Sequence, residues 1–127
     1  MPEQTIYIID DNEDVCQAIK FLLNSFLNLD VKTYICPYVF LEDFSDNPQG
    51  VVIIDLDMPS MNGIHLIQQV KKIKREIGVI IISGHGTSDA ATQSIEAGAQ
   101  AFIVKPLNTE RLLEEVEAIV HESVLDN

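Results

Sequence analysis

The sequence Val51-Val52-Ile53-Ile54-Asp55 places four consecutive β-branched apolar residues directly before a carboxylate. Three similar apolar runs occur elsewhere in the chain: Ile6-Tyr7-Ile8-Ile9, Val79-Ile80-Ile81-Ile82 and Ala101-Phe102-Ile103-Val104. Because these runs are continuous rather than alternating, they predict strands that are covered on both faces, as in a parallel sheet. A fifth, alternating run, Val31-Lys32-Thr33-Tyr34, is typical of an edge strand.

Segments of helical periodicity lie between these runs. Apolar residues recur at steps of three or four in three of them: Val15, Ile19, Leu22 and Phe26; Ile64, Ile67, Val70 and Ile73; Leu112, Val116 and Ile119. Asn12 and Asn108 are suitable N-caps for the first and the last of these helices. Two more helices are expected at about 37–44 and about 88–97, the second being the least firmly anchored. Five strands alternating with five helices predict an α/β, doubly wound, parallel sheet.

Length and composition indicate a single domain over residues 1–127, with a core at about 5–122. Hydrophobic residues make up 46% of the chain, but charges interrupt them too often for a membrane span. The N-terminus, Met1-Pro2-Glu3-Gln4, lacks the features of a secretory signal, so we expect a cytoplasmic protein. In that compartment Cys16 and Cys36 are expected to be reduced thiols.

The formal net charge of −12 argues against direct binding of nucleic acid, since affinity for phosphate backbones depends on Lys and Arg. Basic residues cluster only at Lys71, Lys72, Lys74 and Arg75. Near a helix end, this cluster is better interpreted as a solvated face that interacts favourably with the helix dipole.

Polar residues follow four of the five apolar runs. Asp10 and Asp11 follow the first, and Asp55, Ser83 and Lys105 follow three others. Each alone is explained by turn formation, capping or solvation. In a parallel sheet, however, these strand ends share one edge, where ligands of such sheets bind. We therefore expect the five side chains to converge on one site.

Three carboxylates beside a single ammonium repel one another until a cation binds. Two unit charges about 4 Å apart repel by roughly 4 kcal/mol at an effective dielectric of 20. Oxygen ligands without His or Cys favour Mg²⁺, with Mn²⁺ as a substitute, and Mg²⁺ pairs readily with phosphate oxygens. One carboxylate could then attack a phosphoryl group, a transfer that depends mainly on positioning and charge neutralisation.

Four motifs in this order resemble those of the response-regulator receiver (CheY-like) domains of two-component systems. They are Asp10-Asp11, Asp55-Leu56-Asp57-Met58-Pro59-Ser60-Met61-Asn62-Gly63, Ser83-Gly84-His85-Gly86 and Lys105-Pro106. The resemblance covers most of the chain, from about Ile6 to about Val120. It implies a flavodoxin-like fold with strand order 2-1-3-4-5 and a phosphorelay function. Such a domain catalyses only its own phosphorylation and dephosphorylation and is not otherwise an enzyme.

The resemblance also implies a role for each site residue. Asp55 would be the phosphorylated nucleophile, and Asp11, Asp55 and the backbone carbonyl of Asp57 would ligate Mg²⁺, with Asp10 helping through water. Ser83 and Lys105 would bind the aspartyl phosphate, and the Lys105-Pro106 bond would be cis. Phe102 would turn inward when Ser83 moves. The side chain of Asp57 is expected to face solvent; the alternative is that it orients water and changes the phosphate lifetime.

Ser83-Gly84-His85-Gly86-Thr87, Ala97-Gly98-Ala99 and Phe102-Ile103 resemble one branch more closely, the nitrogen-fixation-type (FixJ/NarL-like) transcriptional regulators. The resemblance implies a sensor histidine kinase or phosphotransfer protein as phosphate donor. It also implies an output face around Ser83 and Phe102, which would dimerise or dock an effector on phosphorylation. A DNA-binding effector domain usually follows such receivers, and none is expected within this chain.

Two other functions are compatible with parts of the sequence. The strand followed by Asp55-Leu56-Asp57 resembles the nucleophile motif of haloacid-dehalogenase-type phosphatases, but that family carries its other metal-binding acids downstream, whereas Asp10 and Asp11 lie upstream. A pseudo-receiver, a binding module with the fold but not the chemistry, usually lacks one of the acids. Here every acid is present.

Overall fold

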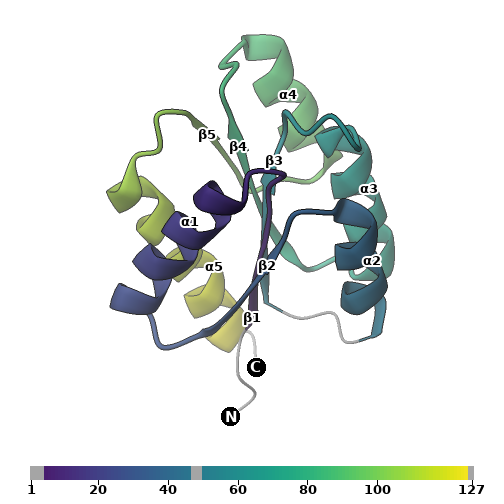
Figure 1. The fold of residues 1–127 in the computed structure, drawn as a ribbon. Helices are drawn as coiled ribbons and strands as arrows, with labels where there is room; N and C mark the ends of the chain where they lie inside the picture. Colours follow the sequence, from purple (N-terminus) through teal and green to yellow (C-terminus); the bar gives the residue numbers. More distant parts are fainter. Residues whose placement is uncertain (1–4, 47–49, 126–127) are drawn as a thin grey trace.

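Five strands alternate with five helices over the part of the chain that the computed structural model describes, residues 5–46 and 50–125 (Figure 1). The strands are β1 (Thr5–Ile9), β2 (Asp30–Tyr34), β3 (Val51–Asp55), β4 (Gly78–Ser83) and β5 (Ala101–Val104). The helices are α1 (Glu13–Phe26), α2 (Pro37–Asp46), α3 (Gly63–Ile73), α4 (Ser88–Ala97) and α5 (Thr109–Leu125). The predicted alternation is confirmed.

All the strand pairs are parallel, and the order across the sheet is β2-β1-β3-β4-β5. The weakly apolar strand β2 lies at the edge, as its alternating sequence predicted. The strands at the centre, β1, β3 and β4, are buried along their whole length. This fold, with strand order 2-1-3-4-5, is the one that the sequence indicated.

Helices cover both faces of the sheet, so alternate residues of each strand enter two separate cores (Figure 1). In β1, Tyr7 and Ile9 pack on the side of α2 and α3, whereas Ile6 and Ile8 pack on the side of α1 and α5. Both faces of a central strand therefore need apolar side chains, which explains why the apolar runs are continuous.

Helix α1 begins at its predicted cap, because the side chain of Asn12 accepts hydrogen bonds from the backbone N–H groups of Asp14 and Val15. Its buried face differs from the predicted stripe. Phe26 is 67% exposed, whereas the buried residues are Cys16, Ile19 and Leu23. The prediction for Phe26 was wrong: Phe26 is exposed in the last turn, and Leu27, directly after the helix, packs against the core instead. Cys16 and Cys36 are free thiols, as expected.

Among the residues that the structure describes, helix α4 is the most weakly packed helix. Ser94 is its one buried residue, and the Ser94 hydroxyl has no hydrogen-bond partner among the described residues. Thr87 caps the N-terminus by accepting a hydrogen bond from the Ala90 N–H, and Gly98, at φ 122°, ends the helix. The prediction that this helix is the least firmly anchored is confirmed.

The basic cluster is only partly solvated. The Lys71 ammonium donates hydrogen bonds to the carbonyls of Ile77, at 2.7 Å, and Arg75, at 3.3 Å. Desolvation by burial lowers the pKa of Lys71, more than the nearby Glu76 raises it. Lys71 therefore stabilises the turn after α3, although the sequence had suggested a purely solvated role. None of the helices in the described residues has the length and apolar content needed to cross a membrane.

Candidate functional site

The register of the parallel strands brings the predicted polar residues to one edge of the sheet. Ile9 pairs with Ile54, so Asp10 and Asp55 follow neighbouring positions on β1 and β3. Ser83 is the last residue of β4 and pairs with Val104, directly before Lys105. The sequence prediction that these side chains share one edge is confirmed.

Three carboxylates form a compact cluster at this edge. One oxygen from each of Asp10, Asp11 and Asp55 lies within 4.8 Å of the others. Asp10 and Asp55 are only 3% and 5% exposed, whereas Asp11 is exposed. Two of the three charges are thus shielded from water, while the third borders the solvent from which a cation would enter.

Local contacts hold the two buried carboxylates in place. The backbone N–H of Asn12 donates to Asp10 Oδ1 at 2.9 Å, and that of Asp57 donates to Asp55 Oδ1 at 3.0 Å. Lys105 Nζ lies 3.6 Å from the same Asp55 oxygen and forms an ion pair with it. Asp55 therefore faces a positive charge on one side and the carboxylate cluster on the other.

Burial raises the pKa of Asp10 to about 6. Desolvation is the largest cause, and the charges of Asp55 and Asp11 add to it, while the hydrogen bond from Asn12 and the charge of Lys105 act in the opposite direction. A buried acid whose charged form is disfavoured in this way is typical of a site that is completed by a cation.

The donor atoms present fit a hard divalent cation. The carboxylates of Asp10, Asp11 and Asp55 supply only oxygen, which is the ligand set of Mg²⁺ or Mn²⁺ rather than of Zn²⁺. Burial first, and then the charges of Asp55 and Asp11, raise the pKa of Asp10, and a cation bound among the three carboxylates would favour its charged form.

Asp57 is exposed, as the sequence predicted, and its carboxylate also contacts the loop after β4. Its Oδ2 accepts a hydrogen bond of 2.7 Å from the Gly84 N–H, and both of its oxygens lie 3.3 Å from Ser83 Oγ. His85 Nδ1 lies 3.3 Å from Asp57 Oδ1. The side chain is 29% exposed. Sequence reasoning missed these contacts because they join the loop after β4 to the loop after β3, and no local pattern encodes that approach.

These contacts also keep Asp57 charged. Burial by itself raises the pKa of Asp57, but hydrogen bonds from Gly84, His85 and Ser83, together with the charge of His85, lower it by more. The net pKa lies below the ordinary value of an aspartate. Asp57 is therefore a fourth carboxylate at the edge, facing the loop after β4 rather than the cluster of Asp10, Asp11 and Asp55.

Ser83 and Phe102 lie on neighbouring strands. The Ser83 hydroxyl is buried, and its described contacts are with the Asp57 carboxylate and with the backbone of His85. Phe102 pairs with Ile81 in the sheet, is half-buried and packs against the core on the side of α2 and α3. The Lys105-Pro106 peptide bond is cis, as the resemblance implied.

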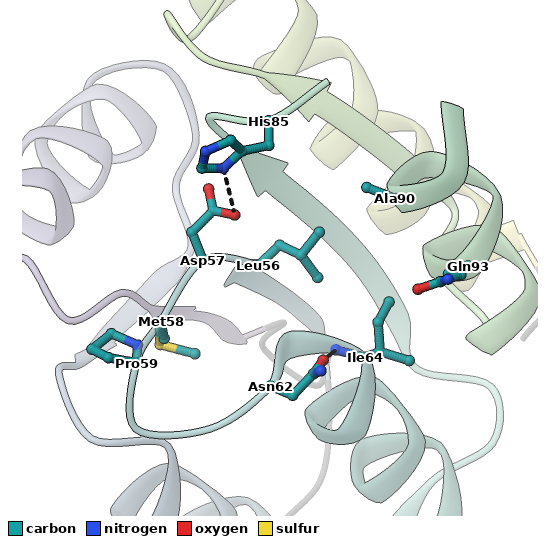
Figure 2. Close-up of a pocket in the computed structure, with 9 residues that line it drawn as sticks. All are labelled: Leu56, Asp57, Met58, Pro59, Asn62, Ile64, His85, Ala90 and Gln93. Atoms are coloured by element: carbon teal, nitrogen blue, oxygen red, sulfur yellow. Dashed lines mark hydrogen bonds and ion pairs between the residues drawn. The ribbon is translucent and has the colours of Figure 1, made fainter. Parts of the chain in front are cut away.

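A pocket of about 560 Å³ lies beside Asp57 and His85 (Figure 2). The loop after β3 forms one wall with Leu56 and Pro59, and helix α4 forms the opposite wall with Ala90 and Gln93. His85 projects over the mouth and points its ring toward Asp57. The pocket thus separates the loop after β3 from α4, next to the candidate site.

Comparison with known proteins places this geometry in a family. A family model described as "Response regulator receiver domain" matches residues 6–117. The chain is 38% identical over 113 residues to the response regulator protein TodT of Pseudomonas putida, covering 89% of this chain and 49% of TodT. It is 35% identical over 119 residues to the transcriptional regulatory protein FixJ of Rhizobium meliloti, covering 92% of this chain and 57% of FixJ. The chain spans about half the length of these curated relatives.

Solved structures agree with the sequence relatives. A response regulator receiver domain protein from Clostridium thermocellum superposes with a TM-score of 0.89 at 31% identity, covering 98% of this chain and 99% of that one. FixJ-N superposes with a TM-score of 0.83 at 34% identity, covering 94% of each chain. The resemblance to FixJ-type regulators is thereby confirmed, and a haloacid-dehalogenase-type assignment is excluded. From its motifs, its fold and its relatives alike, the chain belongs to the response regulator receiver domain family.

Proposed function

We propose that Asp55 accepts a phosphoryl group from a phosphohistidine of a sensor histidine kinase or phosphotransfer protein. The observation that carries this proposal is the position of Asp55: it is 5% exposed at the end of β3, within the carboxylate cluster and ion-paired with Lys105. A buried carboxylate that faces both a cation site and an ammonium is suited to approach an anionic phosphoryl group, because both positive charges offset the repulsion.

The covalent step exchanges one bond to phosphorus for another. An oxygen of Asp55 attacks the phosphorus, and the bond between phosphorus and the donor histidine nitrogen breaks. The electron pair of that bond stays on the histidine nitrogen, and the leaving imidazole is neutral because its other ring nitrogen carries a proton. The product is an acyl phosphate on Asp55, and the chain acts as a phospho-accepting signalling domain rather than a conventional enzyme.

Mg²⁺, for which Mn²⁺ would substitute, would be held by Asp10, Asp11, Asp55 and the backbone carbonyl of Asp57 and would neutralise charge on the phosphoryl oxygens. Lys105 would exchange its ion pair with Asp55 for a charge-assisted hydrogen bond to the phosphoryl group, since its Nζ already lies 3.6 Å from the acceptor carboxylate. Ser83, at the end of the next strand, would bind another phosphoryl oxygen.

The response would pass from Ser83 to the face formed by α4, β5 and α5. A bound phosphoryl group shifts an existing equilibrium by its differential affinity for two states, so the responding element should be weakly anchored. Helix α4 meets this requirement because it buries only Ser94. The output would be a homodimer or contact with an effector, such as a DNA-binding domain outside residues 1–127, in the cytoplasm.

Phosphorylation by acetyl phosphate, read by intact-protein mass spectrometry, tests the acceptor. With Mg²⁺, the wild-type protein should gain one phosphoryl group, whereas Asp55→Asn should fold and remain unlabelled, because an amide is not the nucleophile. Labelling of Asp55 should fall strongly when the metal is chelated, and also in the Asp11→Ala variant. Full labelling of Asp55→Asn would overturn the assignment, and a wild-type protein that never labels would favour the pseudo-receiver alternative.

A further inference from the structure

The contacts of Asp57 raise a question that the proposed function leaves open. The Asp57 carboxylate contacts the Ser83 hydroxyl at 3.3 Å and the Gly84 N–H at 2.7 Å. Ser83 is the last residue of β4, and Gly84 is the first residue of the loop between β4 and α4, residues 84–87. An anionic side chain thus already binds the hydroxyl that the proposed function assigns to the phosphoryl group.

The Ser83 hydroxyl cannot bind both partners at once. It carries a single proton, so it donates to one acceptor at a time, and its described acceptors are the Asp57 oxygens and the His85 carbonyl. To donate to a phosphoryl oxygen on Asp55, Ser83 must first leave Asp57. A second anion near Asp57 would also be repelled by the Asp57 carboxylate, two residues along the chain from Asp55.

We propose that the Asp57 carboxylate is an internal latch, which holds Ser83 and the Gly84 N–H in the unphosphorylated arrangement and competes with the aspartyl phosphate for Ser83. This inference rests on the proposed function of Asp55 and Ser83. It assigns Asp57 a positioning role: the side chain acts through Ser83 and lowers the apparent affinity of the activated state, because a competing arrangement must be given up first.

The structure around the latch allows it to open. The loop has glycine at positions 84 and 86, the His85 side chain is 79% exposed, and the pocket beside Asp57 leaves space between the loop after β3 and α4 (Figure 2). Helix α4, which follows the loop, is held by few buried side chains. Ser83 itself is buried at the end of β4, so opening of the latch requires its hydroxyl to turn away from Asp57 while the exposed loop residues 84–87 move.

A pair of variants with equal charge separates the latch from simple electrostatics. Asp57→Asn and Asp57→Ala both remove the negative charge, but only the asparagine keeps an acceptor oxygen for Ser83 and Gly84. Fluoroberyllate, a phosphate mimic, is titrated into each variant and the wild-type protein by calorimetry at saturating Mg²⁺. We expect Asp57→Ala to bind it about fivefold more tightly than Asp57→Asn, the factor that corresponds to one net hydrogen bond. Asp89→Asn, which removes a charge from the first turn of α4 away from Ser83, serves as a charge control and should match the wild-type protein.

A measurement on the unphosphorylated protein tests the latch without any phosphate mimic. The Gly84 amide, which donates to Asp57 Oδ2, should exchange with solvent more slowly in the wild-type protein and in Asp57→Asn than in Asp57→Ala. Thermal unfolding of the three proteins verifies that each is folded, which we expect because Asp57 is an exposed loop residue and Ser83 is the one buried side chain among its described hydrogen-bond partners.

The outcomes distinguish failure of the latch from failure of the proposed function. Equal fluoroberyllate affinity of Asp57→Ala and Asp57→Asn, or equal Gly84 exchange in the two variants, would overturn the latch while leaving Asp55 as the acceptor. A wild-type protein that neither binds fluoroberyllate nor accepts phosphate would overturn the proposed function, and the competition for Ser83 would fall with it. Tighter binding to Asp57→Ala, together with faster Gly84 exchange, supports the latch.

Discussion

The two sides of the strand edge differ in how firmly the fold holds them. The acid side, formed by Asp10, Asp11 and Asp55 with the ends of β1 and β3, rests on strands that are buried along their whole length. The loop side consists of residues 84–87, which are exposed, and of helix α4, which has one buried residue. The two sides meet at the contact between Asp57 and Ser83.

This difference indicates that the two sides have different functions. A phosphoryl acceptor and a cation site need side chains held in a fixed geometry, which the central strands provide. A responding element needs an equilibrium that a small change can shift, so it is drawn from the weakly packed part of a fold. The acceptor lies at the end of β3, and the responding loop follows the adjacent strand β4.

The largest expected effect is a difference in the free energy of unfolding when isoleucine is replaced by alanine on each side. Ile9, the residue before Asp10, is fully buried, whereas Ile95 of α4 is 49% exposed. Ile9→Ala should lower the free energy of unfolding by about 2–5 kcal/mol, because it leaves a cavity in the core. Ile95→Ala should change it by less than about 1 kcal/mol, as an exposed site whose replacement is a better helix former. Urea unfolding measures both, and similar losses would refute the contrast.

The second prediction concerns the unfavourable ionisation of the buried Asp10 on the acid side. The pKa of Asp10 is raised to about 6 in the folded protein, so ionisation of this acid destabilises the fold as pH rises from about 4 through about 6. In metal-free protein, Asp10→Asn should therefore be more stable than the wild-type protein at pH 7.5, by about 1–3 kcal/mol. The advantage should disappear below about pH 4, where both residues are neutral.

Saturating Mg²⁺ provides the control for that experiment. The metal should stabilise the wild-type protein more than Asp10→Asn, because it binds the folded state and each carboxylate strengthens that binding. Urea unfolding at several pH values, with chelator and with Mg²⁺, gives the required free energies. If the free energies of unfolding of the two proteins differed by a constant amount from pH 4 to pH 7.5, ionisation of Asp10 would not destabilise the fold.

The smallest expected effect lies on the loop side. Ser94→Ala should stabilise the protein by about 1 kcal/mol, because it removes a buried hydroxyl without a partner and introduces a better helix former. The added anchoring of α4 should also reduce the amplitude of its response to fluoroberyllate, measured by hydrogen exchange over residues 88–97. Ser88→Ala, at the exposed start of the same helix, is a control for helix propensity alone. A loss of stability in Ser94→Ala would mean that the hydroxyl has a partner in solution.

Much of the fold follows from local patterns. The predicted strand limits lie within one residue of the observed ones, because continuous apolar runs have few other ways to be buried. Asn12 and Asn108 cap α1 and α5 as predicted, since capping needs only a side-chain oxygen within three residues. Phe26 was misplaced because periodicity identifies the face of a helix but not which residue packs against the core where the helix ends, which here is Leu27.

The sequence by itself determined which residues reach the edge of the sheet. Each of Asp10, Asp11, Asp55, Ser83 and Lys105 follows or ends an apolar run, and parallel strands bring such positions together regardless of the loops between them. Only the tertiary structure decided how the side chains pair there. The contact of Asp57 with Ser83 and Gly84 spans 26 and 27 residues of sequence, and the burial that raises the pKa of Asp10 comes from neighbouring strands. Local sequence sets the position of a residue along its strand, whereas the direction and charge state of its side chain depend on atoms that distant segments bring into contact.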